Sequence, residues 1–323
     1  MDAIEVAEYG DSDVLTVTER EPPAAGDGDV RIDVRAAGVN FADVEQRRGT
    51  YPDGPSPPFV PGLEVAGTVA AAPDDAAVDV GDRVAALASS GGYAEVATAP
   101  VERTFPVPDS LSLREAVAIP VQGLTAHNAL HEWGGLEAGE RVLIHAAAGG
   151  VGSLAVQLAA VADADVFATA STDAKRDLAV ELGADHAIDY TETDVAAAID
   201  DRTDGDGVDL VLDGVGGDAF AASLEALAPA GRIVSFGMAS GSVPTVATPR
   251  LFFENQSVVG YHLEHALEHV PDRVHTALPE LTDHLAAGRI EVVVDETVPL
   301  SAAARAHDAL ADRETVGKVV LEP

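Results

Sequence analysis

The sequence contains no cysteine, and this absence removes several kinds of chemistry at once. Without thiols, the 323-residue chain forms no disulfide bond, has no thiolate nucleophile and builds no zinc site that needs a cysteine ligand. Any reaction that it catalyses must therefore depend on a bound cofactor or on oxygen and nitrogen side chains.

Basic residues are also scarce, because 19 lysines and arginines stand against 55 aspartates and glutamates, for a formal charge of −36. Lys175 and Lys318 are the only lysines. A surface this acidic repels phosphate backbones, so we expect no nucleic-acid partner. Molar salt shortens the Debye length to about 3 Å and screens such self-repulsion, which predicts a salt-adapted protein.

Long apolar runs are missing as well. No run reaches the roughly 18 residues that span a bilayer, and residues 1–5 lack the cationic start of a secretory signal. We therefore expect no membrane span and a cytoplasmic location. The length and the 47% hydrophobic content suit about two domains with cores of their own.

The pattern of apolar residues changes along the chain. Short apolar runs broken by Gly and Pro predict a β-rich first hundred residues, followed by a helical stretch over 113–131. Strands and helices then alternate as in parallel βαβ units. The six predicted strands are 141–146, 165–170, 186–189, 209–213, 232–237 and 257–261, with helices such as 151–161 and 172–182 between them.

The tail returns to a mixed composition. It reads as a helix over 278–287, an apolar segment at 290–294, a helix near 302–311 and a strand at 318–321. We expect this tail to fold back onto the first domain. The predicted domains are therefore 1–118, 119–261 and 262–323, of which the first and third belong together.

One predicted turn, at residues 146–152, gives the strongest indication of a binding site in the sequence. The Rossmann fingerprint G-x-G-x-x-G turns tightly and brings backbone against a pyrophosphate. Here it reads Ala147-x-Gly149-Gly150-Val151-Gly152, with alanine in the first slot, between the apolar strand at 142–144 and a helix whose first amides would face the pyrophosphate. By itself the match is degenerate, but its strand–turn–helix setting predicts a dinucleotide site.

The end of the second strand bears on the choice of cofactor. An NAD site usually has Asp or Glu there to hold the ribose 2′-hydroxyl, whereas this chain has Ala170 and Ser171, with Lys175 one helical turn later. This arrangement favours NADPH. Asp173 keeps NADH open, because a carboxylate in the first turn of a helix either stabilises the helix dipole or binds a ribose.

Several segments together carry a resemblance to a known family, namely residues 37–43, 48–52, 61–67, 80–84, 123–126, the glycine turn, 235–237 and 317–321. With these segments the chain resembles the zinc-free quinone oxidoreductase and zeta-crystallin branch of the medium-chain dehydrogenase/reductase superfamily. The resemblance implies an α/β chain with a GroES-like catalytic domain built from both chain ends and an inserted six-stranded parallel Rossmann domain. It also implies a homodimer, for which strand 257–261 could supply a sheet edge.

The resemblance further implies roles for individual residues. Zinc-dependent relatives carry a Cys near Asn40 and a His near Leu63, and this chain has neither, so we expect no zinc. Asn40, Gln46 and Tyr51 would form the catalytic pocket. The cofactor would be contacted by Asn40, Thr125, Ala147, Gly149, Gly150, Val151, Gly152, Ser171, Lys175, Tyr190, Val215, Phe236, Gly237 and Lys318.

The implied reaction is hydride transfer from NADPH to a small-molecule acceptor. A quinone suits a site without a strong acid, because water can protonate the hydroquinone anion. An alkenal or enoyl-thioester would need a proton source such as Tyr51 or a water on Asn40, and a non-catalytic NADPH-binding protein is a third hypothesis. His262, His265 and His269 have near-helical spacing but no H-E-x-x-H pattern, so we predict no metal site.

Overall fold

The computed structural model describes residues 1–89 and 91–323, which form two compact units. Unit 1 contains residues 1–121 and 292–323, and unit 2 contains residues 122–291. One domain is thus built from both ends of the chain and the other is inserted, as the sequence predicted. Among the described residues no helix is both long and apolar enough to cross a membrane.

The elements of unit 1 are mostly strands. They are β1 (Asp2–Val6), β2 (Leu15–Glu19), β3 (Asp29–Val39), β4 (Glu64–Ala71), β5 (Arg83–Leu87), β6 (Val96–Pro100), β7 (Thr104–Pro106), β14 (Val294–Pro299) and β15 (Lys318–Glu322), with α1 (Phe41–Arg48), α2 (Leu113–Ala116), α12 (Ala303–Ala311) and the 3-10 turns η1 (Ser12–Val14), η2 (Val101–Arg103) and η5 (Leu300–Ala302).

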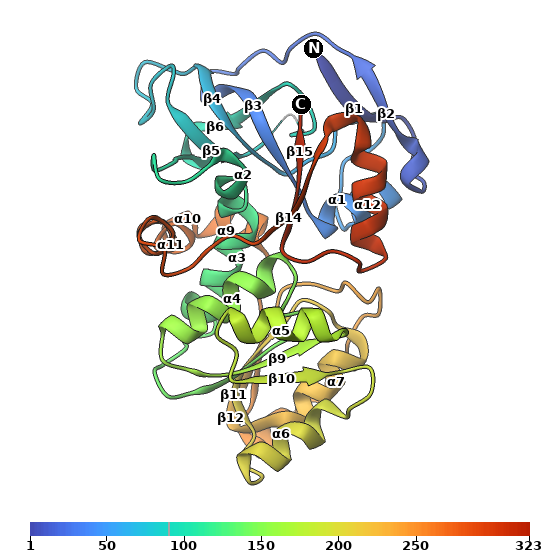
Figure 1. The fold of residues 1–323 in the computed structure, drawn as a ribbon, viewed down its shortest axis with the longest axis vertical. Coiled ribbons are helices and arrows are strands. Elements are labelled where there is room, and N and C mark those ends of the chain that lie inside the picture. The colour runs from blue at the N-terminus through green and yellow to red at the C-terminus, as the bar shows by residue number, and fades with distance from the viewer. Residues whose placement is uncertain (90) are drawn as a thin grey trace. The chain divides into compact units, whose positions relative to one another are not determined.

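A seven-stranded sheet forms the body of this unit, in the order β14-β15-β3-β4-β5-β7, with β6 also paired to β3. Figure 1 shows the red C-terminal strand β15 beside the blue strand β3, and the two pair antiparallel, with Val320 opposite Gly38. The alternation in β3 explains its burial, because Val30, Ile32 and Val34 all point into the core. The sheet therefore joins the two chain ends.

Unit 2 alternates strands and helices. Its elements are β8 (Arg141–Ile144), β9 (Asp165–Ala170), β10 (His186–Asp189), β11 (Val208–Asp213), β12 (Leu227–Ser235), β13 (Ser257–Gly260), α3 (Leu124–His127), α4 (Gly150–Val161), α5 (Asp173–Glu181), α6 (Val195–Thr203), α7 (Gly217–Ala226), α8 (Thr248–Glu254), α9 (Leu263–His269), α10 (Pro271–His275), α11 (Ala277–Ala286) and the π-helical turns η3 (Ile119–Gly123), which begins in unit 1, and η4 (Asn128–Glu132).

The six predicted strands form one parallel sheet in the order β10-β9-β8-β11-β12-β13. This is the doubly wound order of dinucleotide-binding domains. Right-handed crossovers place α4 and α5 on one face and α6 and α7 on the other (Figure 1). The carboxyl ends of β8 and β11 lie side by side where the strand order reverses, which is where such sheets bind ligands.

The stretch 113–131 is helical, as predicted, and is divided into α2, η3, α3 and η4, since Pro120 lacks the N–H that a continuous α-helix requires. The last part of the predicted strand 232–237 lies beyond β12, which ends at Ser235. Strand β14 begins at Val294, the last residue of the apolar segment 290–294.

The predicted boundary after residue 261 also differs from the division after residue 291. The reason is that helices α9 to α11 belong to unit 2. The Asn128 side-chain amide donates to the Val274 carbonyl at 3.2 Å, and His127 Nε2 lies 3.2 Å from the Glu280 carboxylate. A composition change at 261 could not reveal these contacts, since they join residues about 150 positions apart.

Candidate functional site

The turn after β8 leads directly into the start of α4. Gly149 is the N-cap, and the first intrahelical hydrogen bond runs from the Ser153 amide to the Gly149 carbonyl at 2.8 Å. The amides of residues 150–152 precede that bond, and residues 149–151 are partly exposed. Amides at the start of a helix point along a positive dipole end, so this turn suits an anionic group such as a pyrophosphate.

Two of the glycines lie close to neighbouring atoms, and backbone packing requires one of them, Gly152. A Cβ on Gly152 would lie 2.3 Å from the Ala146 carbonyl oxygen and 2.8 Å from Ala147 Cα. A Cβ on Gly150 would lie 2.0 Å from Gln122 Nε2. The last glycine therefore packs the helix against the turn, and Gln122, which the sequence analysis did not single out, lies against the turn.

Alanine in the first slot is explained by the backbone. The positive φ of this turn, 51°, falls at Ala146, one residue before the slot. Ala147 itself is fully buried, and its amide donates to the Thr169 carbonyl on β9 at 3.0 Å. The slot therefore accepts a Cβ, and the departure from the glycine fingerprint leaves the turn intact.

A buried histidine supports the same turn and was missed from the sequence. His145 Nδ1 lies 3.0 Å from the Thr169 hydroxyl, and His145 Nε2 lies 2.8 Å from the Ser223 hydroxyl on α7. Burial lowers the pKa of His145, so the neutral ring is favoured. This residue ties the end of β8 to β9 and α7. The signal in the sequence was a histidine directly following an apolar strand.

The residues expected at a 2′-phosphate gather at one edge of the sheet. Strands β9 and β10 are parallel neighbours with Ala170 opposite Asp189, so Ser171 and Tyr190 follow adjacent strand ends. Thr172 caps α5, since its hydroxyl accepts from the Lys175 amide at 3.3 Å. The structure thus brings Ser171 and Tyr190 to one edge of the sheet, beside the first turn of the helix that carries Lys175.

Arg176 is a further cation at this edge that sequence reasoning missed. Its guanidinium pairs with the carboxylates of both Asp173 and Asp189. The hydrogen bond from the Thr191 hydroxyl is the main cause that lowers the pKa of Asp189, which stays ionised. Asp173 was the residue that left NADH possible as the cofactor, and its carboxylate forms an ion pair with Arg176.

The carboxyl ends of β11 and β12 lie along the same side of the sheet as the carboxyl ends of β8, β9 and β10. The buried Asp213 carboxylate accepts the amides of Val215 at 2.8 Å and Gly216 at 2.9 Å. The Phe236 amide donates to the Asp213 carbonyl at 2.9 Å, and a Cβ on Gly237 would lie 2.7 Å from the Gly214 carbonyl oxygen. Three predicted residues, Val215, Phe236 and Gly237, thus belong to one pair of interlocked loops organised by Asp213.

Thr125 belongs to the same unit as the turn. It lies in α3 and is 8% exposed.

In unit 1, Asn40 lies between two buried charges. Its Nδ2 donates to Glu64 Oε1 at 2.9 Å, and its Oδ1 accepts from Lys318 Nζ at 2.9 Å. Lys318 also pairs directly with Glu64 and donates to the Val39 carbonyl at 3.1 Å. Both charged residues are fully buried. The two partners fix both ends of the Asn40 amide and so fix its orientation.

This geometry changes the role expected for Lys318. An ammonium group has three N–H donors, and all three are used on Val39, Asn40 and Glu64. The structure therefore gives Lys318 a positioning role rather than a direct cofactor contact. Glu64 was missed from the sequence, although a glutamate within the apolar run 63–66 must be paired when that run is buried.

Gln46 and Tyr51 lie on and just after α1, the helix that Asn40 begins. Gln46 is 8% exposed, and its carbonyl accepts the Gly49 amide at 3.0 Å. Tyr51 is half-buried, and its backbone amide donates to the Glu45 carbonyl at 3.2 Å. These backbone contacts hold both residues in unit 1 with Asn40.

A buried network lies below the start of α1. The Asp43 carboxylate accepts hydrogen bonds from the backbone N–H of Asn40 at 2.8 Å and from the Tyr93 hydroxyl at 3.3 Å. That hydroxyl lies 3.0 Å from His307 Nε2. Burial raises the pKa of Asp43 from 3.8 to about 7, although the hydrogen bond from the Asn40 backbone N–H opposes the shift. Burial, followed by Arg47 and Arg48, lowers the pKa of His307 from 6.5 to about 3.

These two shifts predict opposite effects of pH on stability. Asp43 contributes stability below about pH 4 that is lost as the pH rises to about 7, whereas His307 contributes stability above pH 6.5 that is lost as the pH falls toward 3. Between pH 4 and 6.5 the two pH dependences of stability offset each other.

Two substitutions separate these effects. Relative to the unsubstituted chain, Asp43→Asn should gain stability as the pH rises, and His307→Gln should gain stability as the pH falls. Denaturant unfolding at several pH values measures both, and parallel curves would contradict the assignment.

The residues present do not fit a catalytic zinc ion at the position where zinc-dependent relatives hold one. Leu63 offers no donor atom, and the amide of Asn40 is engaged at both ends by Glu64 and Lys318. The chain has no cysteine to take their place.

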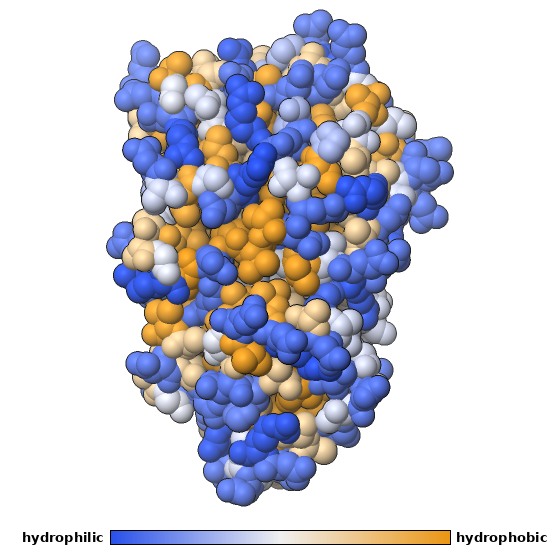
Figure 2. Space-filling model, viewed as in Figure 1, coloured by the Kyte–Doolittle hydropathy of each residue, from blue (hydrophilic) through white to orange (hydrophobic). Residues whose placement is uncertain are grey.

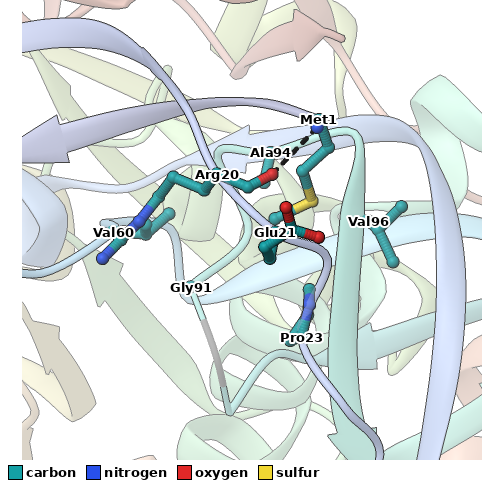
Figure 3. Close-up of a pocket in the computed structure, with 8 residues that line it drawn as sticks. All are labelled: Met1, Arg20, Glu21, Pro23, Val60, Gly91, Ala94 and Val96. Carbon is teal, nitrogen blue, oxygen red and sulfur yellow. Dashed lines mark hydrogen bonds between the residues drawn. The ribbon is translucent and has the colours of Figure 1, made fainter.

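A pocket of about 330 Å³ lies elsewhere in unit 1, and Figure 3 shows its lining. The terminal amine of Met1 donates to the Arg20 carbonyl at 2.9 Å at its rim. The lining contains none of the predicted site residues. We therefore do not assign it a role in the chemistry.

Comparison with known proteins agrees with the two-unit division. Residues 26–109 match the alcohol dehydrogenase GroES-like domain, and residues 150–283 match the zinc-binding dehydrogenase model. A quinone oxidoreductase from Pseudomonas aeruginosa is 36% identical over 99% of both chains. The human synaptic vesicle membrane protein VAT-1 homolog is 35% identical over 98% of this chain and 84% of its own length.

Solved structures extend the likeness to three dimensions. The Escherichia coli quinone oxidoreductase complexed with NADPH has a TM-score of 0.94 and 33% identity, over the full length of both chains. A mycobacterial protein complexed with NADPH has the same TM-score and 40% identity over the full length of both. With these matches and the paired GroES-like and Rossmann units, the chain belongs to the quinone oxidoreductase branch of the medium-chain dehydrogenase/reductase superfamily.

Proposed function

We propose that the chain is an NADPH-dependent quinone reductase that works without a catalytic zinc ion. The observation that carries the cofactor assignment is the open start of α4 at the strand switch point, beside an edge where Ser171 replaces the carboxylate of an NAD site. The relatives named quinone oxidoreductases support the acceptor.

Different residues would bind different parts of the cofactor. The amides of residues 150–152 would hold the pyrophosphate, since the Gly149 amide already donates to the Ala146 carbonyl at 2.9 Å. Ser171, Lys175 and Tyr190 would hold the 2′-phosphate. The interlocked loops at Val215 and Phe236 would flank the cofactor. In unit 1, Asn40 is oriented by Glu64 and Lys318 and is the candidate contact of the nicotinamide. In unit 2, Thr125 is assigned to the cofactor as well.

NADPH supplies the hydride when it is bound, so the protein needs chiefly to align donor and acceptor and to exclude water. A quinone that accepts a hydride becomes a hydroquinone anion, which water can protonate. The site therefore needs no strong general acid for this acceptor. For an α,β-unsaturated carbonyl, the Tyr51 hydroxyl is the candidate proton donor.

A panel of acceptors tests this function. The purified chain, at molar salt, should oxidise NADPH with one or more quinones at a rate well above its rate with alkenals or enoyl-thioesters. Faster turnover with the unsaturated carbonyls would replace the quinone assignment. Tight NADPH binding without turnover of any acceptor would show a non-catalytic binding protein. Activity that survives a chelator supports zinc independence.

Replacing Lys175 tests the 2′-phosphate site. Lys175→Ala should raise the Kd of NADPH about tenfold and leave that of NADH nearly unchanged, because it removes a charged partner that only NADPH uses. Arg202→Ala makes the same charge change on the exposed surface of α6 and serves as the control. Equal losses for both cofactors would refute the role of Lys175. Titration with each cofactor measures the result.

We further propose a cytoplasmic homodimer adapted to high salt. Strand β13 ends the parallel sheet, and Phe252 and Phe253 on the preceding helix are 62% and 76% exposed, which is unusual for large apolar side chains. Figure 2 shows hydrophilic residues over much of the visible face of each unit. A mass measurement in molar salt should give twice the chain mass, and a monomer would contradict the pairing.

A further inference from the structure

Helix α9 carries a group of side chains of the types that bind metal ions, although the histidine spacing alone predicted no metal site there. His265, Glu268 and His269 are all exposed, and one ligand atom of each lies within 4.8 Å of the others. The two imidazole rings have centroids 4.0 Å apart and planes inclined by 31°. Residues four apart lie on one face of a helix, so both histidines can reach the same ion.

The hydrogen bonds of His269 suit a ligand. Its Nδ1 lies 3.0 Å from the His265 carbonyl oxygen, and because a carbonyl can only accept, Nδ1 carries the proton. The neutral ring then has its lone pair on Nε2. A backbone carbonyl that binds one ring nitrogen fixes the tautomer and the orientation of many metal-bound histidines.

The opposite face of α9 anchors the backbone. Ala266 and Leu267 are 6% and 5% exposed, and the His265 amide donates to His262 Nδ1 at 3.2 Å, which caps the helix. The three candidate ligands therefore project from a backbone that is already held in place.

We propose that His265, Glu268 and His269 form a surface site for a divalent transition-metal ion of the zinc class. Two imidazoles and a carboxylate are the donor set that zinc, nickel and copper share, whereas calcium and magnesium prefer oxygen ligands alone. Water completes the coordination. The ion ties the last turn of a seven-residue helix together, and a helix of this length gains little stability from its own hydrogen bonds.

Titration calorimetry with Zn²⁺ tests the site. The full-length chain is used without a histidine tag, after treatment with a chelator, in molar KCl, because high salt screens the diffuse attraction of cations to a surface of charge −36. One ion should bind per chain. His265→Ala and His269→Ala should each weaken binding by about tenfold or more, and Glu268→Gln by less.

Two matched variants act as controls. Glu264→Gln makes the same change as Glu268→Gln on the same helix, and His186→Ala makes the same change as His265→Ala and His269→Ala on β10. Both variants should bind Zn²⁺ as the unsubstituted chain does. Zn²⁺ should also raise the Tm of the unsubstituted chain and leave that of His269→Ala unchanged. Absence of saturable binding at molar salt, or equal affinity in the ligand variants and the controls, would overturn the proposal.

Discussion

Replacing Lys318 with Met is expected to lower the free energy of unfolding by about 3–5 kcal/mol. Glu64 and Lys318 are both fully buried and pair with each other, so the substitution leaves a carboxylate in the core without its counterion. Glu64 would keep only the Asn40 side chain at 2.9 Å and the Val121 amide at 2.8 Å as donors. Two neutral donors do not replace an ammonium group in a medium of low dielectric constant.

The chain supplies a matched control for this prediction, because it has one other lysine. Lys175→Met makes the same chemical change outside the core and should shift stability by about 0.5 kcal/mol or less. The double variant Glu64→Gln/Lys318→Met should recover much of the loss, since it removes both charges. Urea unfolding followed by circular dichroism measures all three. Equal midpoints for the two lysine variants would contradict the buried-pair assignment.

Replacing Gly152 with Ala should lower kcat/KM for NADPH on the order of a hundredfold. The new Cβ would lie 2.3 Å from the Ala146 carbonyl oxygen, so the helix and the turn must separate. That separation moves the helix-start amides that would bind the pyrophosphate. Stability should also fall by about 1–3 kcal/mol, because the site is already closely packed.

The three glycines of the turn form a graded series for this test. A Cβ on Gly149 would approach no atom closer than the Ala146 carbonyl oxygen at 3.2 Å, so Gly149→Ala should have a small effect. Gly150→Ala meets only the end of the Gln122 side chain, which can rotate away, and should fall between the other two. Gly28→Ala, in open space, is the control. A different order of effects would show that packing does not determine the function of the turn.

Much of the fold could be predicted from the local periodicity of apolar residues. All six strands of the Rossmann sheet, and the helices after β8 and β9, were predictable because alternating apolar runs and helix-start residues report on near neighbours. The stretch 113–131 was also predictable as helical, but its division into four helical elements was not. The boundary at 291 was missed because α11 is held by contacts with residues far away in the chain.

For the candidate site, too, local sequence patterns predicted only part of the arrangement. The sequence by itself determined the turn at 146–152, the missing carboxylate after the second strand and the absence of thiol chemistry. Only the tertiary structure decided that Lys318 is committed to Glu64 and Asn40, that Arg176 engages Asp173, and that His265 and His269 converge with Glu268. The physical reason is that the role of a charged side chain depends on the group that it contacts in the folded protein. The partner of Lys318 lies 254 residues away, beyond the reach of any local pattern.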